Sequence, residues 1–306
     1  MNLLFIGGTR FAGLAMAREA LRRGHQVDLF HRGGKPFTGL DGARHLHGDR
    51  SKELSALAQG RWDASIDTCG YRPGDIHAVA DALAGRGGPY CFVSTGSVYA
   101  EDIPAGSDET AALASTAGLD HATLASIPIN GDNYGPLKVL CEQAVRERYT
   151  DPLILRPPYI VGPDDYTMRF PEWVKRIAAG GVVEAPGPRE AAIQYVDARD
   201  LANFTIDAIE RRLAGTFNVS VVQPPFGFGD LLDGIVEGVA PAGTQLRWIG
   251  VEEAKASKTP WPLWHQGLDL GIVAVTSAAA RAQGLRGRPL AETARDTLAW
   301  LRRLPS

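Results

Sequence analysis

The chain has 306 residues, of which 44% are hydrophobic and 22% charged, with a formal net charge of −3. This balance argues against a broad nucleic-acid-binding surface, which needs clustered basic charge. No apolar run approaches the roughly 20 residues that cross a bilayer, and three widely spaced cysteines are typical of reduced thiols. We expect a cytoplasmic protein with a small-molecule substrate, without nucleic-acid or membrane partners and without a metal site.

Short apolar runs alternate with helical periodicity through the first half of the chain. The expected strands are Leu3–Ile6, Val27–His31, Arg44–His47, Ala64–Asp67, Tyr90–Ser94 and Leu153–Leu155. The expected helices between them are Phe11–Gly24, Ile76–Ala84 and Tyr134–Tyr149. This alternation predicts an α/β fold with a doubly wound parallel sheet of the Rossmann type. In such a sheet the ligand binds beyond the carboxyl ends of the strands.

The alternation breaks at residues 99–132, a stretch rich in Ala, Ser, Asp and Gly that is too long for an ordinary connection. Beyond it we expect helices at Phe170–Ala179, Ala198–Arg212 and Leu290–Leu301 and a strand at Gly215–Val219. Asp197 and Asp200 are placed to begin the second of these helices. The expected dinucleotide-binding Rossmann domain is residues 1–157 plus about 193–220. Residues 158–192 plus 221–306 then form a smaller, discontinuous α+β substrate-capping lobe.

The glycine-rich turn GGTRFAG, residues 7–13, follows the first strand and opens the first helix. A turn in this position directs backbone N–H groups and a helix N-terminus at a pyrophosphate. Gly7 permits the tight turn, and Gly13 lets the helix pack closely on the strand. The middle position of the glycine pattern is Arg10. We therefore expect dinucleotide binding, with an arginine added to the phosphate loop.

The tip of the second strand discriminates between NAD and NADP. NAD-binding sites usually place an acidic residue there, which accepts hydrogen bonds from the ribose hydroxyls. This chain has His31 and Arg32 at the tip, and Asp28 lies earlier, within the strand. A guanidinium binds a 2′-phosphate by charge-assisted hydrogen bonds, so we expect NADP(H) in preference to NAD(H). Arg10 reaches the same 2′-phosphate or lies along the pyrophosphate, and Asp49 is placed to bind the adenine amino group.

The segments STGSVY, residues 94–99, and YGPLK, residues 134–138, carry the candidate chemistry. Tyr134 and Lys138 are four residues apart and therefore share one face of a helix. A neighbouring ammonium lowers the pKa of a tyrosine from about 10, which makes the phenol usable as an acid or base. Lys138 is also placed to hold the nicotinamide ribose. Thr95, at the end of the fifth strand, is placed to orient the substrate oxygen.

The order of five segments, GGTRFAG, STGSVY, YGPLK, LRPPYIVGP and QYVDARDLA, resembles the short-chain dehydrogenase/reductase superfamily, and within it the extended NAD-dependent epimerase/dehydratase family. The arginine-bearing glycine turn resembles an atypical branch of that family. The resemblance implies a Rossmann domain, a nicotinamide dinucleotide and a Ser/Thr–Tyr–Lys site. By matching, this site falls on Thr95, Tyr134 and Lys138, with Ser97 as the alternative hydroxyl. We expect the coenzyme to contact Gly7, Thr9, Arg10, Phe11, Gly13, His31, Arg32, Asp49, Arg50, Cys69, Gly70, Tyr71, Lys138, Pro157 and Tyr159.

Two departures from the family pattern narrow the chemistry. Sugar-nucleotide dehydratases carry an acidic pair directly after the hydroxyl residue, where this chain has Gly96 and Ser97, so we discount dehydration. Nucleotide-sugar enzymes tend to have an asparagine before Gly162-Pro163, where this chain has Tyr159-Ile160-Val161, a lining that suits a less polar substrate. The candidate substrate contacts are Ser97, Tyr99, Ile160, Phe170, Gln194 and Trp264.

The leading hypothesis is an NADPH-dependent reductase, or the reverse alcohol dehydrogenase, that acts on a carbonyl of a small-molecule or sugar-like substrate. Tyr134 protonates the oxygen, Lys138 lowers the pKa of the tyrosine, and Thr95 holds the oxygen. One alternative is an NAD-dependent nucleotide-sugar 4-epimerase, which uses the same three residues. Another is a non-catalytic protein that senses NADP(H), although such proteins usually lack the Tyr/Lys pair.

The family resemblance bears on partners as well. A related glycine turn occurs in chloroplast RNA-associated proteins, but the acidic composition disfavours RNA binding by this chain. The helix that carries Tyr134 often pairs across dimers in this family, so the resemblance implies a homodimer.

Overall fold

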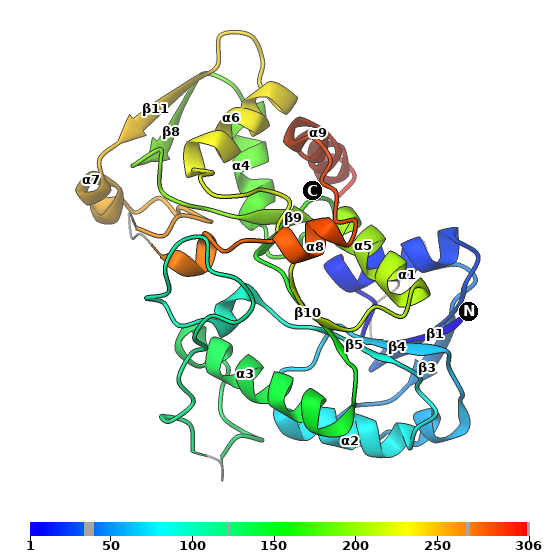
Figure 1. Ribbon diagram of the computed structural model, residues 1–306. Coiled ribbons are helices and arrows are strands. Elements are labelled where there is room, and N and C mark those ends of the chain that lie inside the picture. The colour runs from blue at the N-terminus through cyan, green and yellow to red at the C-terminus, as the bar shows by residue number, and fades with distance from the viewer. Residues whose placement is uncertain (34–39, 121–122, 267–269, 305–306) are drawn as a thin grey trace.

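A computed structural model describes residues 1–33, 40–120, 123–266 and 270–304 of the chain. Figure 1 shows a larger lobe that contains the N-terminus and a smaller lobe above it. Within the described ranges, no helix is long and apolar enough to span a membrane.

The larger lobe is built on a seven-stranded parallel sheet with the strand order β10-β6-β5-β4-β1-β2-β3. The strands are β1 (Asn2–Ile6), β2 (Gln26–His31), β3 (Arg44–His47), β4 (Ala64–Asp67), β5 (Tyr90–Val93), β6 (Leu153–Arg156) and β10 (Gly215–Asn218). The strand order reverses at β1, so a crevice opens beyond the carboxyl ends of β1 and its neighbours. The expected α/β Rossmann fold is confirmed, and the expected bounds of each of these strands agree to within one residue.

Helices cover both faces of this sheet (Figure 1). The helices α1 (Phe11–Arg22) and α5 (Ala198–Glu210) pack against each other on one face, and α2 (Pro73–Leu83) packs against α3 (Gly131–Arg148) on the other. The α3 helix begins one turn before the predicted start because Asn130 and Asn133 form a capping box. This early start places Tyr134 within the first turns of α3.

The smaller lobe has an apolar core of its own, in which Trp173 and Phe228 meet edge to face with ring centroids 5.5 Å apart. Its helices and strands are α4 (Arg169–Ala178), β8 (Val182–Pro186), α6 (Phe228–Val239), β11 (Gln245–Ile249), α7 (Val251–Ala256) and α9 (Leu290–Leu301). The strands β8 and β11 pair in parallel, and α4, α6 and α9 pack on one another. The sequence predicted α4 and α9 but neither α6 nor the small sheet.

Two short connections bring distant segments together near the sheet edge. The strands β7 (Tyr159–Val161) and β9 (Tyr195–Asp197) pair in parallel, with Tyr159 opposite Tyr195. The long segment after β5 is tied to the stretch before α8 (Ala278–Ala282), because the Gly106 N–H donates to the Ala274 carbonyl at 2.6 Å. Neither short strand was predicted, since three residues carry too little periodicity to detect.

Candidate active site

The glycine turn between β1 and α1 forms a cradle from which side chains are excluded. Gly7 and Gly8 have φ angles of +94° and +79°, a region that favours glycine. A Cβ atom on Gly7 would lie 2.6 Å from Thr68 Oγ1, and one on Gly13 would lie 2.9 Å from the Gly8 Cα. No side chain caps the first turn of α1, so the helix dipole and the N–H groups there favour an anion. The cradle therefore fits a dinucleotide pyrophosphate.

Arg10 stands at the N-terminus of α1 with an exposed side chain. Its guanidinium carbon lies 5.4 Å from the ring centroid of Tyr166, which belongs to the segment after β7. Of the two roles expected for Arg10, this direction favours a position along the pyrophosphate over one at the 2′-phosphate. On either side of it, Thr9 is half-buried and Phe11 packs into the core with a φ angle of +40°.

Three imidazoles gather at the tip of β2 and β3. His31 Nε2 lies 2.8 Å from His45 Nδ1, and the Gly33 N–H donates to His31 Nδ1 at 3.0 Å. Since His31 Nδ1 accepts a hydrogen bond, Nε2 carries the proton of the neutral ring. Burial, and then repulsion from the imidazoles of His45 and His47, lowers the pKa of His31 to about 4. His31 is therefore neutral at pH 7 and adds no charge to a phosphate site.

Arg32 is an exposed cation at the same tip, and the residues 34–39 that follow it lie outside the described residues. Asp28 is turned away from this position, because its carboxylate accepts hydrogen bonds from the Arg44 guanidinium and from Trp62 Nε1. The Asp49 carboxylate accepts hydrogen bonds from the Ser51 N–H and hydroxyl at 3.0 and 2.7 Å, within its own turn. Both carboxylate oxygens of Asp28 are thus engaged within the fold and are not free to bind ribose hydroxyls in the manner of an NAD site.

Arg50 lies beneath the expected coenzyme position rather than on its surface. Its two terminal nitrogens donate to the two carboxylate oxygens of Asp67, each at 2.8 Å, and Tyr90 donates to the same carboxylate at 2.7 Å. Arg50 also donates to Cys69 Sγ at 3.3 Å. The geometry commits Arg50 to a buried ion pair that supports the end of β4 and its link to Tyr90. Sequence reasoning missed Asp67 and Tyr90, although an aspartate that ends a buried strand is itself an unusual feature.

Tyr134 meets the end of β5 because α3 approaches the turn at Gly96–Val98 very closely. A Cβ atom on Gly135 would lie 2.1 Å from the Ser97 carbonyl oxygen, so the approach requires glycine. The Thr95 side chain lies close enough to the Tyr134 hydroxyl to lower the pKa of that phenol. The structure therefore brings two of the three expected catalytic groups into contact.

The pKa of Tyr134 is shifted upwards, which is opposite to the sequence expectation. Burial raises the pKa of this phenol, and the largest opposing influences are the nearby Thr95 side chain and the positive charge of Arg169. The ammonium of Lys138 was expected to dominate, but it points to the strand ends instead. Tyr134 therefore keeps its proton at neutral pH.

Lys138 is buried and bridges two parts of the sheet edge. Its ammonium donates to the carbonyls of Gly70 and Val93, both at 2.9 Å, and lies 4.0 Å from the Phe92 ring centroid and 5.7 Å from that of Tyr71. Burial lowers the pKa of Lys138 to about 8. The lysine thus gathers Gly70 and Tyr71, two of the expected coenzyme contacts, around the end of β5.

The expected substrate contacts occupy different environments. Ser97 is exposed and its N–H donates to Thr95 Oγ1 at 3.1 Å. Tyr99 is buried, where its hydroxyl donates to Asn218 and accepts from Arg156. Phe170 is fully buried in the core of the smaller lobe. The structure therefore brings Ser97 to the catalytic hydroxyls and leaves Tyr99 and Phe170 inside the fold.

The remaining expected contacts line the junction of the two lobes. Gln194 is buried and binds the backbone of Val275 through both ends of its amide. It borders a pocket of about 510 Å³ that is also lined by Arg189, Phe226 and Asp230. Trp264, half-buried, donates to the Gly187 carbonyl, and Ile160 is half-buried in β7. Among the described residues, no group of three His, Cys, Asp or Glu side chains could hold a metal ion.

A second face of the catalytic end is formed by the segment after β6. The Pro157 carbonyl accepts a hydrogen bond from the Gly96 N–H at 2.8 Å, which places Tyr159 close to the end of β5. The Tyr159 hydroxyl lies 3.1 Å from His265 Nε2, and the Arg169 guanidinium carbon lies 5.1 Å from the Tyr159 ring centroid. Sequence reasoning missed Arg169, whose one local signal is its position directly before a predicted helix.

The fold and the side-chain-free cradle at the carboxyl edge of its sheet are those of a dinucleotide-binding protein. Within that class, residues 77–220 match the model of the NAD dependent epimerase/dehydratase family. The match covers just under half of the chain and agrees with the family that the order of motifs implied. The atypical branch suggested by the arginine-bearing turn stays a prediction.

Individual relatives agree with this assignment at the level of the fold. A Burkholderia cenocepacia protein of known crystal structure is similar over 99% of this chain and 98% of its own, with a TM-score of 0.76 and 20% identity. The UDP-glucose 4-epimerase of Thermus thermophilus, solved in complex with NAD, is similar over 100% of both chains, with a TM-score of 0.70 and 15% identity.

A curated relative is the chloroplast stem-loop binding protein of 41 kDa b from Arabidopsis thaliana. It is 26% identical to this chain over 261 residues, which make up 79% of this chain and 63% of the relative. The match thus spans less than two thirds of the relative's length.

Proposed function

We propose that the chain is an NADP(H)-dependent carbonyl reductase, or the alcohol dehydrogenase that runs the reverse reaction, with Thr95, Tyr134 and Lys138 as its catalytic residues. The observation that carries the proposal is the proximity of the Tyr134 and Thr95 side chains at the sheet edge that also holds the phosphate cradle. When bound in that cradle, the nicotinamide coenzyme supplies or accepts the hydride. Gly7, Gly13 and Arg10 are the residues that would hold its pyrophosphate.

In the proposed reaction, the residues of the protein bind the carbonyl oxygen and transfer one proton to it. In the reducing direction, Thr95 and Tyr134 bind the carbonyl oxygen, and the Tyr134 hydroxyl donates its proton to that oxygen as the alcohol forms. The raised pKa of Tyr134, caused by burial, keeps the phenol in the donor form at neutral pH. The ammonium of Lys138 binds the carbonyls of Gly70 and Val93 and so holds the strand ends that border the site.

Replacement of Tyr134 by Phe tests the proposal. We expect the turnover of aldehyde reduction to fall about 10²- to 10⁴-fold, because the proton donor is lost, while the dissociation constant for NADPH stays nearly unchanged. Tyr149→Phe is the matched control, since Tyr149 ends the same helix and its buried hydroxyl has no hydrogen-bond partner in the described structure. Unchanged turnover in Tyr134→Phe would remove the proposed role.

The proposed preference for NADP(H) is supported by the exposed Arg32 and by the engagement of Asp28 with Arg44 and Trp62. Dissociation constants for NADPH and NADH, measured by coenzyme fluorescence, decide the question. We expect Arg32→Gln to weaken NADPH binding at least tenfold and to leave NADH binding unchanged. Equal affinities in the wild type, or tighter NADH binding, would reverse the preference.

A nucleotide-sugar 4-epimerase is the alternative that the solved relatives favour, since the Thermus thermophilus relative is a UDP-glucose 4-epimerase. Such an enzyme retains tightly bound NAD and consumes no added coenzyme. Absorbance of a heat-denatured extract of the purified protein separates the cases, because stoichiometric NAD in the extract supports the epimerase. A sensor protein would bind NADP(H) and show no turnover with any carbonyl compound.

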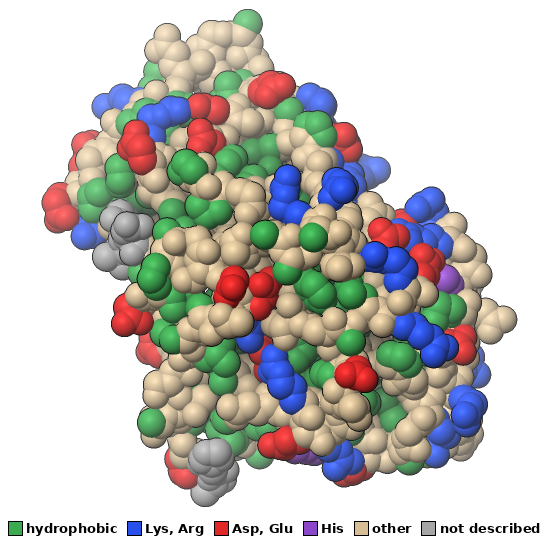
Figure 2. Space-filling model, in the orientation of Figure 1, with side chains coloured by type: hydrophobic (Ala, Val, Ile, Leu, Met, Phe, Trp, Pro, Cys, Tyr) green, Lys and Arg blue, Asp and Glu red, His purple; other side chains and the backbone are tan. Residues whose placement is uncertain are grey.

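RNA binding is a further candidate because one relative is a stem-loop binding protein. The net charge of −3 opposes it, and acidic and basic side chains are interspersed over the face shown in Figure 2. A gel-shift assay with a stem-loop RNA at physiological salt tests this candidate function, and retarded migration of the RNA would support it. Cytoplasmic location and a homodimer stay predictions from the sequence.

A further inference from the structure

A cation without an acidic partner stands beside the proposed proton donor. Arg169 is the first residue of α4, and its side chain is exposed. Its Nε donates to Thr167 Oγ1 at 3.1 Å. Within the described part of the chain, its two terminal nitrogens form neither a hydrogen bond nor an ion pair. A guanidinium with two free terminal nitrogens is the fork that binds a carboxylate or phosphate bidentately.

The surroundings fix Arg169 near the catalytic end rather than in open solvent. Its guanidinium carbon lies 5.1 Å from the ring centroid of Tyr159. Tyr159 follows Pro157, which is hydrogen-bonded to the residue after Thr95. The same guanidinium is close enough to Tyr134 to lower the pKa of that phenol, against the larger effect of burial.

Neither of the two nearby acids forms an ion pair with Arg169. Asp164 pairs with Arg18 at 2.6 Å. Asp165 is fully buried and accepts hydrogen bonds from the N–H and hydroxyl of Thr167, and it lies beyond ion-pair distance of Arg169. Arg169 therefore forms no ion pair with either described acid, although its charge lowers the pKa of Asp165 against the larger effect of burial.

We propose that Arg169 binds an anionic oxyacid group, a carboxylate or a phosphate ester, on the substrate of the reductase. This inference rests on the proposed function and adds the class of substrate: a carbonyl compound with an acidic group. The ring of Tyr159 borders the guanidinium, so the part of the substrate that joins the acid to the carbonyl is apolar or aromatic. Arg169 is thus a specificity-determining residue, separate from the proton donor.

Three aldehydes of similar shape serve as probes: 4-formylbenzoate, its neutral methyl ester, and 4-formylphenyl phosphate. Binding is measured by isothermal titration calorimetry with NADP⁺ present, and reduction is followed with NADPH. We expect at least one charged probe to bind at least tenfold more tightly than the ester. The better of the two charged probes identifies carboxylate or phosphate as the natural group.

Variants of Arg169 and a control variant separate the effect of its charge from a general effect of substitution. In Arg169→Gln, the affinity for the preferred charged probe should fall at least tenfold while the affinity for the ester stays constant. Arg169→Lys keeps the charge but loses the forked guanidinium, so its affinity for the charged probe should lie between those of the wild type and Arg169→Gln. Arg247→Gln is the control, because Arg247 is an exposed arginine on β11 in the same lobe.

The outcomes test the role of Arg169 separately from the proposed reductase activity. Equal affinity for the charged and neutral probes, or an equal effect of Arg169→Gln on both, overturns the role of Arg169 even if both aldehydes are reduced. Selective binding of a charged probe without any reduction by NADPH supports Arg169 and contradicts the proposed reductase activity.

Discussion

At the scale of single residues, Gly135 controls how closely the helix of the proton donor approaches the sheet. The position of a Cβ atom there, 2.1 Å from the Ser97 carbonyl oxygen, overlaps with backbone that cannot rotate away. Any larger residue must separate α3 from the end of β5. The contact between Tyr134 and Thr95 depends on that distance, so one missing side chain sets the geometry of the site.

We expect Gly135→Ala to lower the free energy of unfolding by about 1–3 kcal/mol, as overpacking does, and to reduce turnover about a hundredfold, because a displacement of 1 Å is enough for such a loss. Chemical denaturation and aldehyde reduction measure the two effects. Gly131→Ala, at the first position of the same helix, has nothing within 4 Å of the added methyl group and serves as control. Equal behaviour of the two variants would show that the close approach has no catalytic role.

Lys138 gives the site a pH dependence of defined sign. Burial lowers the pKa of Lys138 to about 8, whereas burial raises the pKa of Tyr134. Rising pH therefore removes the charge of Lys138 before the proton of Tyr134. We expect kcat/KM for carbonyl reduction to be full below pH 8 and to fall as the pH rises through about 8. In Lys138→Met this inflection should vanish along with most of the activity, and an inflection that persists in the variant would assign it to another group.

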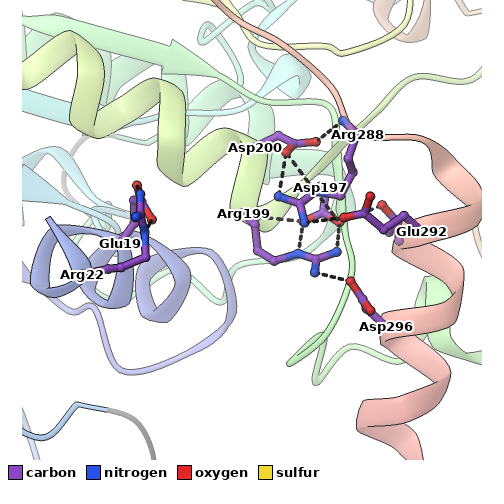
Figure 3. A network of polar contacts seen from close by, with 9 residues as sticks. Glu19, Arg22, Asp197, Arg199, Asp200, Arg288, Glu292 and Asp296 are labelled. Atoms are coloured by element: carbon purple, nitrogen blue, oxygen red, sulfur yellow. Dashed lines mark hydrogen bonds and ion pairs between the residues drawn. The ribbon is translucent and has the colours of Figure 1, made fainter.

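At the scale of elements, α5 and α9 are joined by a network of charges around Asp197 (Figure 3). The Asp197 carboxylate is fully buried, caps α5 by accepting from the Arg199 N–H, and accepts from the Arg199 guanidinium and the Thr293 hydroxyl. Arg288 binds Asp200 at 2.9 Å and reaches Glu292 on α9. A buried charge of this kind is costly once its partners are removed.

We expect Asp197→Ala to lower the free energy of unfolding by about 3–5 kcal/mol, because Arg199 and Arg288 lose their shared carboxylate and α5 loses its cap. Urea denaturation measures the change. The pair of Arg22 and Glu19 on α1, also drawn in Figure 3, is the control. Arg22 is exposed, so Arg22→Gln should leave the stability unchanged. A small effect of Asp197→Ala would mean that the lobes are held together by apolar contacts alone.

Elements differ in how far the sequence predicts them. The strands of the large sheet are apolar runs separated by helical periodicity, and that pattern predicted their bounds to within a residue. The helix α6 was missed because Gly229, Gly234 and Gly238 resemble helix breakers. In the structure two of them permit close packing on α9: a Cβ atom at Gly234 would lie 2.6 Å from Leu290, and one at Gly238 2.6 Å from the Ala291 carbonyl. These two glycines are needed for packing between helices, and the local sequence of α6 does not reveal that requirement.

At the scale of the whole molecule, the candidate site combines residues from both lobes. Motifs close in sequence predicted the half formed by Thr95, Tyr134 and Lys138. The other half includes Arg169 and His265, and His265 meets Tyr159 across 106 positions of the chain. Contacts of that range leave no periodic signal in the sequence. The predicted direction of the Tyr134 pKa shift was wrong for the same reason, since the burial that raises this pKa depends on contacts between distant segments.

The most direct measurement of the central claim is the transfer of label from NADPH deuterated at both C4 positions to an aldehyde, 4-formylbenzoate or its methyl ester, with the product analysed by mass spectrometry. The proposal predicts one deuterium in the product alcohol for each coenzyme oxidised by the wild type, and loss of nearly all of this transfer in Tyr134→Phe. Coenzyme oxidation without label in the alcohol, no transfer by the wild type, or equal transfer by the variant would contradict it.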